Sequence, residues 1–122
     1  MPQHPFSPPR GRIESFDVHS RALEGNLLGD PATRRVLVYL PEAYATADAP
    51  LPVMVDLAAF SGSGLKRTAW RAFEESLPQR IDRLIASGRM APAVFVLPDC
   101  FTRFGGNQYV DSVAVGGWEQ FL

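Results

Sequence analysis

Two groups of residues with the types and spacing needed for chemistry directly follow apolar segments of the chain. The first is the loop 61–64, SGSG, which comes after the apolar residues 52–57. The second lies in residues 99–112, which follow the apolar residues 91–98. Glycine permits backbone angles that other residues avoid. A glycine loop between a strand and a helix is where α/β folds place binding and catalysis, at the carboxyl edge of the sheet.

Composition and charge exclude several classes of function. The 122 residues are 46% hydrophobic, enough to bury a core in one domain. Twelve basic residues balance 13 acidic ones, so the chain lacks the excess of positive charge that binds nucleic acid. No apolar run has the length of a membrane span, no export signal is recognisable, and the single Cys100 excludes an internal disulfide. We therefore expect a cytoplasmic protein with no nucleic acid or membrane partner.

The first half of the chain predicts strands. Residues 1–12 are proline-rich and are expected to form an extended or disordered lead-in to one domain over 13–122. Alternating residues predict a half-buried strand at 13–19, and an apolar run predicts a second strand at 35–40. The link between them has the composition of a loop, so the two strands should pair antiparallel. Residues 52–57 form a β-branched apolar run that predicts a third, buried strand.

A helix and a further strand follow. Apolar residues recur at helical spacing from Ala69 through Phe73 and onward, which predicts a helix over 70–87, with Pro78 expected to end or kink it and Gly88 to close it. Residues 91–98 are apolar throughout and predict a strand buried on both faces. Residues 99–117 read as a long loop and 118–122 as the first turn of another helix. The fold class is therefore α/β, with antiparallel first strands and then a parallel βαβ unit with a crossover helix.

The order and spacing of several runs resemble one family. These runs are residues 20–31 (SRALEGNLLGDP), 35–41 (RVLVYLP), 92–100 (PAVFVLPDC) and 105–112 (GGNQYVDS), with the central apolar strand between the second and the third. Together they resemble the N-terminal part of an esterase family of α/β-hydrolases, whose members include enterochelin-esterase-like proteins, S-formylglutathione hydrolases and the antigen 85 mycolyltransferases. The resemblance implies a serine esterase that cleaves a small carboxylic ester or thioester through an acyl-enzyme, without cofactor or metal.

The resemblance also implies which residues of this chain contribute to the site. In the family, the loop after the third strand supplies a backbone N–H to the oxyanion hole, and by motif position this donor is Phe60. Most relatives carry glycine where Ala59 stands, and the alternative is that residues 58–60 only pack under the following helix. Ser61, Gln108 and Tyr109 are candidates to line a substrate cleft, whereas 108–112 could equally be a loop folded over the core.

The catalytic triad is not found in the 122 residues. No Gly-x-Ser-x-Gly nucleophile elbow occurs, and Ser63 follows the wrong strand without that spacing. Only His4 and His19 could act as a base, and a structural role is expected for His19. In the family, the serine, the acid and the histidine come later in the sequence. We therefore expect that the chain is cut within the helix that begins at 118 and that it has no esterase activity by itself.

Other interpretations remain. A small, complete, non-catalytic α/β binding module is the alternative to the esterase. A nucleotide-binding loop is disfavoured because the glycine motifs for phosphate are absent. Asp56, Asp99 and Cys100 do not form a metal-binding pattern, and Asp99 is expected to cap a turn. Because the family's next strand would be missing, residues 53–57 should form an exposed sheet edge through which copies of the chain could self-associate.

Overall fold

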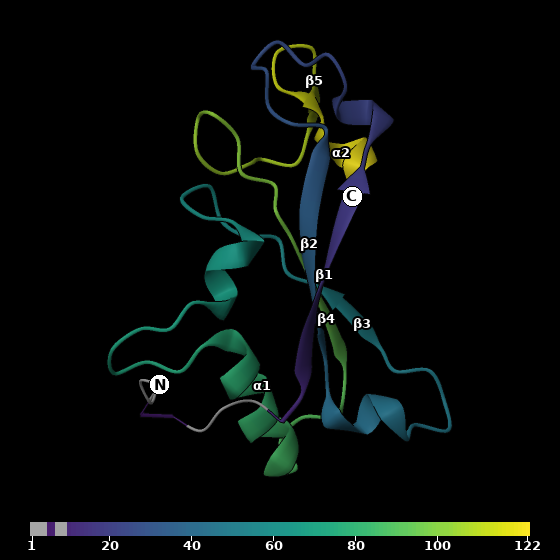
Figure 1. Ribbon diagram of the computed structural model, residues 1–122, viewed down its shortest axis with the longest axis vertical. Helices are drawn as coiled ribbons and strands as arrows, with labels where there is room; N and C mark the ends of the chain where they lie inside the picture. Colours follow the sequence, from purple (N-terminus) through teal and green to yellow (C-terminus); the bar gives the residue numbers. More distant parts are fainter. Residues whose placement is uncertain (1–4, 7–9) are drawn as a thin grey trace.

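A computed structural model describes residues 5–6 and 10–122, and in these residues it shows a four-stranded mixed sheet (Figure 1). The strands are β1 (Arg12–His19), β2 (Thr33–Leu40), β3 (Val53–Val55) and β4 (Val94–Pro98), in the spatial order β1-β2-β4-β3. β2 pairs antiparallel with both β1 and β4, whereas β3 pairs parallel with β4. The predicted strand pairings are confirmed. The expected lead-in at 1–12 falls largely outside the described residues.

β3 occupies one edge of the sheet. Its only neighbour in the described part of the chain is β4, and Val53, Met54 and Val55 are each more than half exposed. The prediction of a buried strand at 52–57 is therefore wrong for this chain, although the prediction of an exposed edge is confirmed. An apolar, β-branched run identifies a strand, but its burial also requires neighbours on both sides and a covered face.

The helix between β3 and β4 begins later than its periodicity predicts. α1 runs over Leu77–Ala86, and Ser76 and Gln79 form a capping box at its start. Pro78 lies in the first turn, where no intrahelical N–H bond is required, so it helps to begin the helix rather than ending it. The predicted role of Pro78 is therefore wrong.

The residues before α1 turn back on themselves instead of forming a helix. A short 3-10 helix, η3 (Gly64–Thr68), is followed by a turn in which Arg71 and Glu74 form an isolated bridge. Phe73 in this turn has a φ of 66° and is 93% exposed, although its spacing predicted the buried face of a helix. The predicted helix start near Trp70 is therefore wrong, because the local capping sequence around Ser76 outweighs the periodicity.

The end of α1 agrees with the prediction. Gly88 has a φ of 70°, a conformation that glycine adopts at little cost, and its N–H donates to the Ile85 carbonyl at 3.0 Å. The Arg89 N–H donates to the Leu84 carbonyl, also at 3.0 Å, which completes a Schellman motif. The chain then turns into β4, which is buried at four of its five residues.

The described residues form two separate hydrophobic cores. The first core is beneath α1 and contains Tyr39, Ile81, Ala93 and Phe95, with Leu77, Ile85 and Met90 packed around them. The second core lies near the opposite end of the molecule, where α2 (Trp118–Phe121) contacts the short helix η1 (Arg21–Leu23) (Figure 1). It contains Leu23, Cys100 and Trp118, with Ala32, Tyr109, Val115 and Phe121 around them.

Short elements complete the described chain. The predicted loop 99–117 contains a small hairpin of β5 (Asp111–Ser112) and β6 (Gly116–Gly117), which are too short to produce a sequence period. The helical turn expected at 118–122 is present as α2, and η2 (Glu42–Ala45) lies in the connection before β3. Within the described residues, the helices are all too short or too polar to cross a membrane.

Candidate functional site

The candidate site lies where the parallel strands β3 and β4 end. The Asp56 N–H donates to the Val96 carbonyl at 2.9 Å, which extends the parallel pairing one residue beyond β3. The loops 57–64 and 99–110 both leave the sheet at this edge, as parallel pairing requires. The chemistry-bearing groups identified in the sequence are therefore brought to the same edge of the sheet.

Phe60 occupies a tight turn after β3. The Gly62 N–H donates to the Ala59 carbonyl at 2.9 Å and closes this turn around Phe60. Phe60 is 54% exposed, so it does not simply pack under the following helix, although the neighbouring Ala58 is buried. Among the described residues, no hydrogen-bond acceptor is found for the Phe60 N–H. A backbone N–H held in a turn can bind an oxyanion without reorganisation.

The segment 106–109 fixes the path of this turn. The Gly106 N–H donates to the Phe60 carbonyl, and a Cβ atom at position 106 would overlap that same carbonyl group. The Tyr109 hydroxyl donates to the Ala58 carbonyl at 2.5 Å. Burial raises the pKa of Tyr109, so this hydroxyl stays protonated as a donor. Residues 58–60 are therefore held from the side of the loop after β4.

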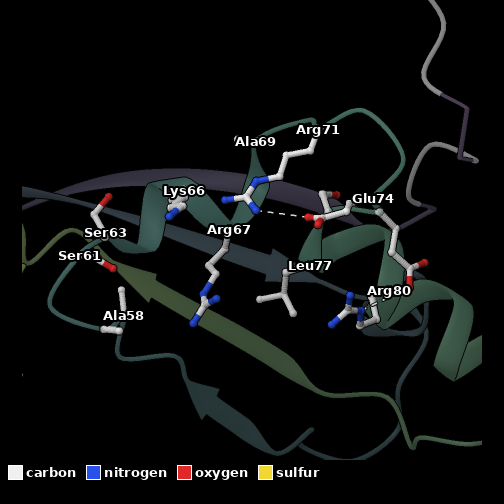
Figure 2. Close-up of a pocket in the computed structure, with 14 residues that line it drawn as sticks. Ala58, Ser61, Ser63, Lys66, Arg67, Ala69, Arg71, Glu74, Leu77 and Arg80 are labelled. Carbon is white, nitrogen blue, oxygen red and sulfur yellow. Dashed lines mark hydrogen bonds and ion pairs between the residues drawn. The ribbon is translucent and has the colours of Figure 1, made fainter.

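A cavity of about 420 Å³ opens beside the turn, between the glycine loop and the start of α1 (Figure 2). Its lining comprises Ala58, Ala59, Ser61, Gly62, Ser63, Lys66, Arg67, Ala69, Arg71, Glu74, Glu75, Ser76, Leu77 and Arg80. Ser61 is thus placed on a cavity, as its predicted role requires. Gln108 is exposed and does not line the cavity, nor does Tyr109. The substrate-binding roles of Ser61, Gln108 and Tyr109 stay predictions.

The charged side chains of the cavity are largely paired. Arg67 binds Asp56 with atoms 2.7 Å apart, and Figure 2 shows Arg71 paired with Glu74, at 3.2 Å. Lys66 forms no ion pair in the described part of the structure.

Glu75 lies at the start of α1 between two arginines. Its carboxylate is 2.5 Å from the Arg83 guanidinium and 3.3 Å from that of Arg80. The hydrogen bond from Arg83 lowers the pKa of Glu75, with Arg80 adding to the effect. Glu75 therefore lines the cavity as a carboxylate whose negative charge is balanced by the two arginines.

The described residues contain no nucleophile with a histidine base beside it. His19 lies exposed at the end of β1, where its ring nitrogens contact the Thr33 hydroxyl at 3.0 Å and the Glu24 carboxylate at 2.6 Å, not Ser63. His4 lies outside the described residues. Cys100 is buried, and this burial raises its pKa to about 12, so its thiol is not a nucleophile.

Asp99 caps a turn, as predicted: its Oδ1 accepts from the Phe101 N–H at 3.1 Å. In the same region the sequence interpretation missed Arg34, which is 4% exposed. Arg34 donates to the Asp99 carboxylate at 3.1 Å and lies over the Trp118 ring at 5.3 Å. Strand alternation could have found it, because Arg34 and Arg35 must face opposite sides of β2.

Across the described chain, no group of three His, Cys, Asp or Glu side chains is arranged to hold a metal ion.

Comparisons with known proteins show a likeness of fold to a solved esterase structure. The architecture is a mixed sheet with a helix on one face and glycine turns at the ends of its parallel strands. A solved structure of a ferulic acid esterase is similar to it, with a TM-score of 0.55 and 20% sequence identity over 84% of this chain. The alignment covers 34% of that structure, so the chain spans about a third of its length. No family model and no curated protein matches the chain.

Proposed function

We propose that this chain forms the N-terminal part of a serine esterase with an α/β-hydrolase sheet, which cleaves carboxylic esters or thioesters through an acyl-enzyme. In this proposal the Phe60 N–H donates to the oxyanion that forms when a serine attacks the ester carbonyl. The serine, its histidine and its acid come from residues outside 1–122. The reaction needs no cofactor.

The observation that carries the proposal is the Phe60 turn at the carboxyl end of β3. Its N–H has no acceptor among the described residues, and its backbone is held by Gly106 and Tyr109. Preorganised donors of this kind stabilise tetrahedral intermediates of acyl transfer. The likeness to a ferulic acid esterase supports the same class, and it makes an ester of an aromatic acid a reasonable first substrate to assay.

The test begins with the coding sequence downstream of Leu122. The proposal expects a Gly-x-Ser-x-Gly elbow followed by an Asp or Glu and a His. The protein encoded by the whole reading frame should then hydrolyse p-nitrophenyl acetate or methyl ferulate, and alanine at the elbow serine should abolish turnover. A whole reading frame without an elbow, or one whose product hydrolyses neither ester, would instead favour the non-catalytic binding module.

The role of the Phe60 turn is tested in that same protein. Gly106→Ala should displace the Phe60 carbonyl and reduce kcat by about 10²-fold or more, the usual effect of losing an oxyanion donor. Phe60→Leu retains the backbone and should keep most of the rate. If the two variants show equally small effects, Phe60 is not the donor.

The 122-residue chain itself should not hydrolyse activated esters above background, because residues 5–6 and 10–122 contain no nucleophile with a histidine base beside it. The measurement is release of p-nitrophenol from p-nitrophenyl acetate by the purified chain. Turnover that is lost in Ser63→Ala would show that Ser63 is a nucleophile after all.

A further inference from the structure

Lys66 is the only lysine in the sequence, in contrast to 11 arginines, and it lies on the cavity beside the Phe60 turn. Its side chain extends over the glycine loop: a Cβ built at Gly62 would lie 3.4 Å from Lys66 Cδ. The lysine stem therefore passes within van der Waals reach of position 62 of the loop. Lys66 is exposed, and its ammonium group has no acidic partner among the described residues.

Lys66 differs in this respect from the other cations of the cavity. The three arginines in the lining have carboxylate partners: Asp56 for Arg67, Glu74 for Arg71 and Glu75 for Arg80. Arg67 binds Asp56 with two nitrogens, at 2.7 Å through Nε and 3.2 Å through Nη2, so its planar donor face is occupied. Lys66 is therefore the one cation of the lining without a carboxylate partner among the described residues, whereas Arg80 shares the Glu75 carboxylate with Arg83.

Two hydroxyl groups lie on the same part of the cavity. Ser61 and Ser63 both line it, and neither hydroxyl has a hydrogen-bond partner among the described residues. Figure 2 shows both serines on the side of the cavity from which Lys66 extends. One ammonium with adjacent hydroxyl donors matches a singly charged carboxylate, whereas a dianionic phosphate is better matched by more than one free cation.

We infer that this cavity binds a carboxylate group of the substrate through the Lys66 ammonium, assisted by the Ser61 and Ser63 hydroxyls. The identity of that substrate rests on the proposed function: it is an ester that carries a free carboxylate, such as a half-ester of a dicarboxylic acid. Ala58 and Ala59 line the same cavity and lead directly into the Phe60 turn. The carboxylate is therefore held beside the place where the ester carbonyl reacts.

The binding step can be tested on the 122-residue chain without catalysis. Reductive ¹³C-methylation labels Lys66 and the terminal amine alone, and the Lys66 signal is identified by its absence from the Lys66→Gln variant. Monomethyl succinate should shift the Lys66 signal saturably, whereas neutral dimethyl succinate should not. An unsaturable shift, equal shifts with both compounds, or tighter binding of inorganic phosphate would overturn the inference.

A charge-matched pair of variants tests the role of Lys66 itself. Lys66→Gln should weaken the binding of monomethyl succinate about 10-fold, as read from the amide NMR signals of Gly62 and Ser63. Arg89→Gln removes one exposed positive charge outside the cavity, so it should change the affinity for monomethyl succinate less than 2-fold. Equal weakening in both variants would show general electrostatic attraction and contradict a site. The dispersion of the amide spectrum verifies that each variant is folded.

Catalysis by the whole protein separates this inference from the proposed function. If it hydrolyses p-nitrophenyl hemisuccinate with a higher kcat/KM than p-nitrophenyl butyrate, and Lys66→Gln removes this preference, the carboxylate site is supported. If it hydrolyses both esters equally well, the inference fails and the esterase proposal stands. If it hydrolyses neither ester while the chain still binds monomethyl succinate, the esterase proposal fails and the carboxylate site stands as a binding site.

Discussion

At the scale of single residues, Arg34 determines how the end of the sheet beside the second core is held together. Its guanidinium donates to the Asp99 carboxylate and carbonyl and, at 2.5 Å, to the Phe101 carbonyl. It also lies over the Trp118 ring. A buried charge is costly unless it is paired and hydrogen-bonded, and here both conditions are met. Arg34 thereby connects β2, the loop after β4 and α2.

The adjacent arginines of β2 provide a matched comparison. Arg34→Ala should reduce the free energy of unfolding by about 3 kcal/mol, because it removes a buried donor and leaves its acceptors unsatisfied. Arg35→Ala breaks an exposed pair with Asp17 and should cost about 0.5 kcal/mol or less. Urea denaturation of both variants measures the difference. Similar losses in the two variants would show that the Arg34 contacts contribute little to stability.

The residue types that mark the candidate site could be predicted, but their contacts could not. The glycine loop after residues 52–57 indicated the edge of the sheet at which the candidate site lies, and motif position led to Phe60. The bonds from Gly106 and Tyr109 to residues 58–60 join segments more than 40 positions apart, which no local period encodes. The cavity cations were missed for a related reason: they surround one space only because the residues before α1 turn back.

At the scale of elements, α1 depends on its capping residues. Ser76→Ala removes the acceptor of the Gln79 N–H and should lower stability by about 1 kcal/mol, the usual value for an N-cap. The control is Ser87→Ala at the other end, whose exposed hydroxyl bonds the Leu84 carbonyl. This change should alter stability by less than about 0.5 kcal/mol. The urea midpoints of the two variants are compared. Equal losses of stability would show that the Ser76 cap does not stabilise α1 more than an exposed hydroxyl does.

The pairing of Glu75 with α1 gives stability a pH dependence. The folded-state pKa of Glu75 lies below its ordinary value of 4.5, mainly because of the Arg83 hydrogen bond. The unfolded chain therefore takes up this proton first, and the stabilisation is present above the unfolded pKa and lost as the pH falls through the folded pKa. Glu75→Gln should flatten the acid side of the urea-midpoint curve. Glu74→Gln, whose carboxylate is 61% exposed, should not.

Element types could be predicted where one signal dominated. Residues 13–19, 35–40 and 91–98 have strong periodic or apolar patterns, and β1, β2 and β4 lie on them. The helix was extended too far because an apolar period continued through Phe73 while the Ser76–Pro78 sequence set the true start. The β5–β6 hairpin, with strands of two residues each, offered no signal that a sequence pattern could detect.

At the scale of the whole molecule, the edge at β3 should cause the chain to self-associate. Val53, Met54 and Val55 present an apolar strand that has one side unpaired among the described residues, which is the profile of a strand that pairs with another chain. Sedimentation of the 122-residue chain should show dimers or larger species. Val55→Lys places a charge on this edge and should shift the chain toward monomer. A monomeric wild-type chain with one sharp unfolding transition would contradict this prediction and favour the self-contained binding module.

The two hydrophobic cores also give the molecule a built-in optical probe. Of the two tryptophans, Trp118 is 1% exposed in the second core, whereas Trp70 is 56% exposed near the cavity. A buried indole fluoresces at shorter wavelength than a hydrated one, so the blue edge of the emission reports the second core alone. Tyr109 packs against that core and holds the Ala58 carbonyl. The colour of Trp118 emission therefore reports whether the core against which Tyr109 packs is intact.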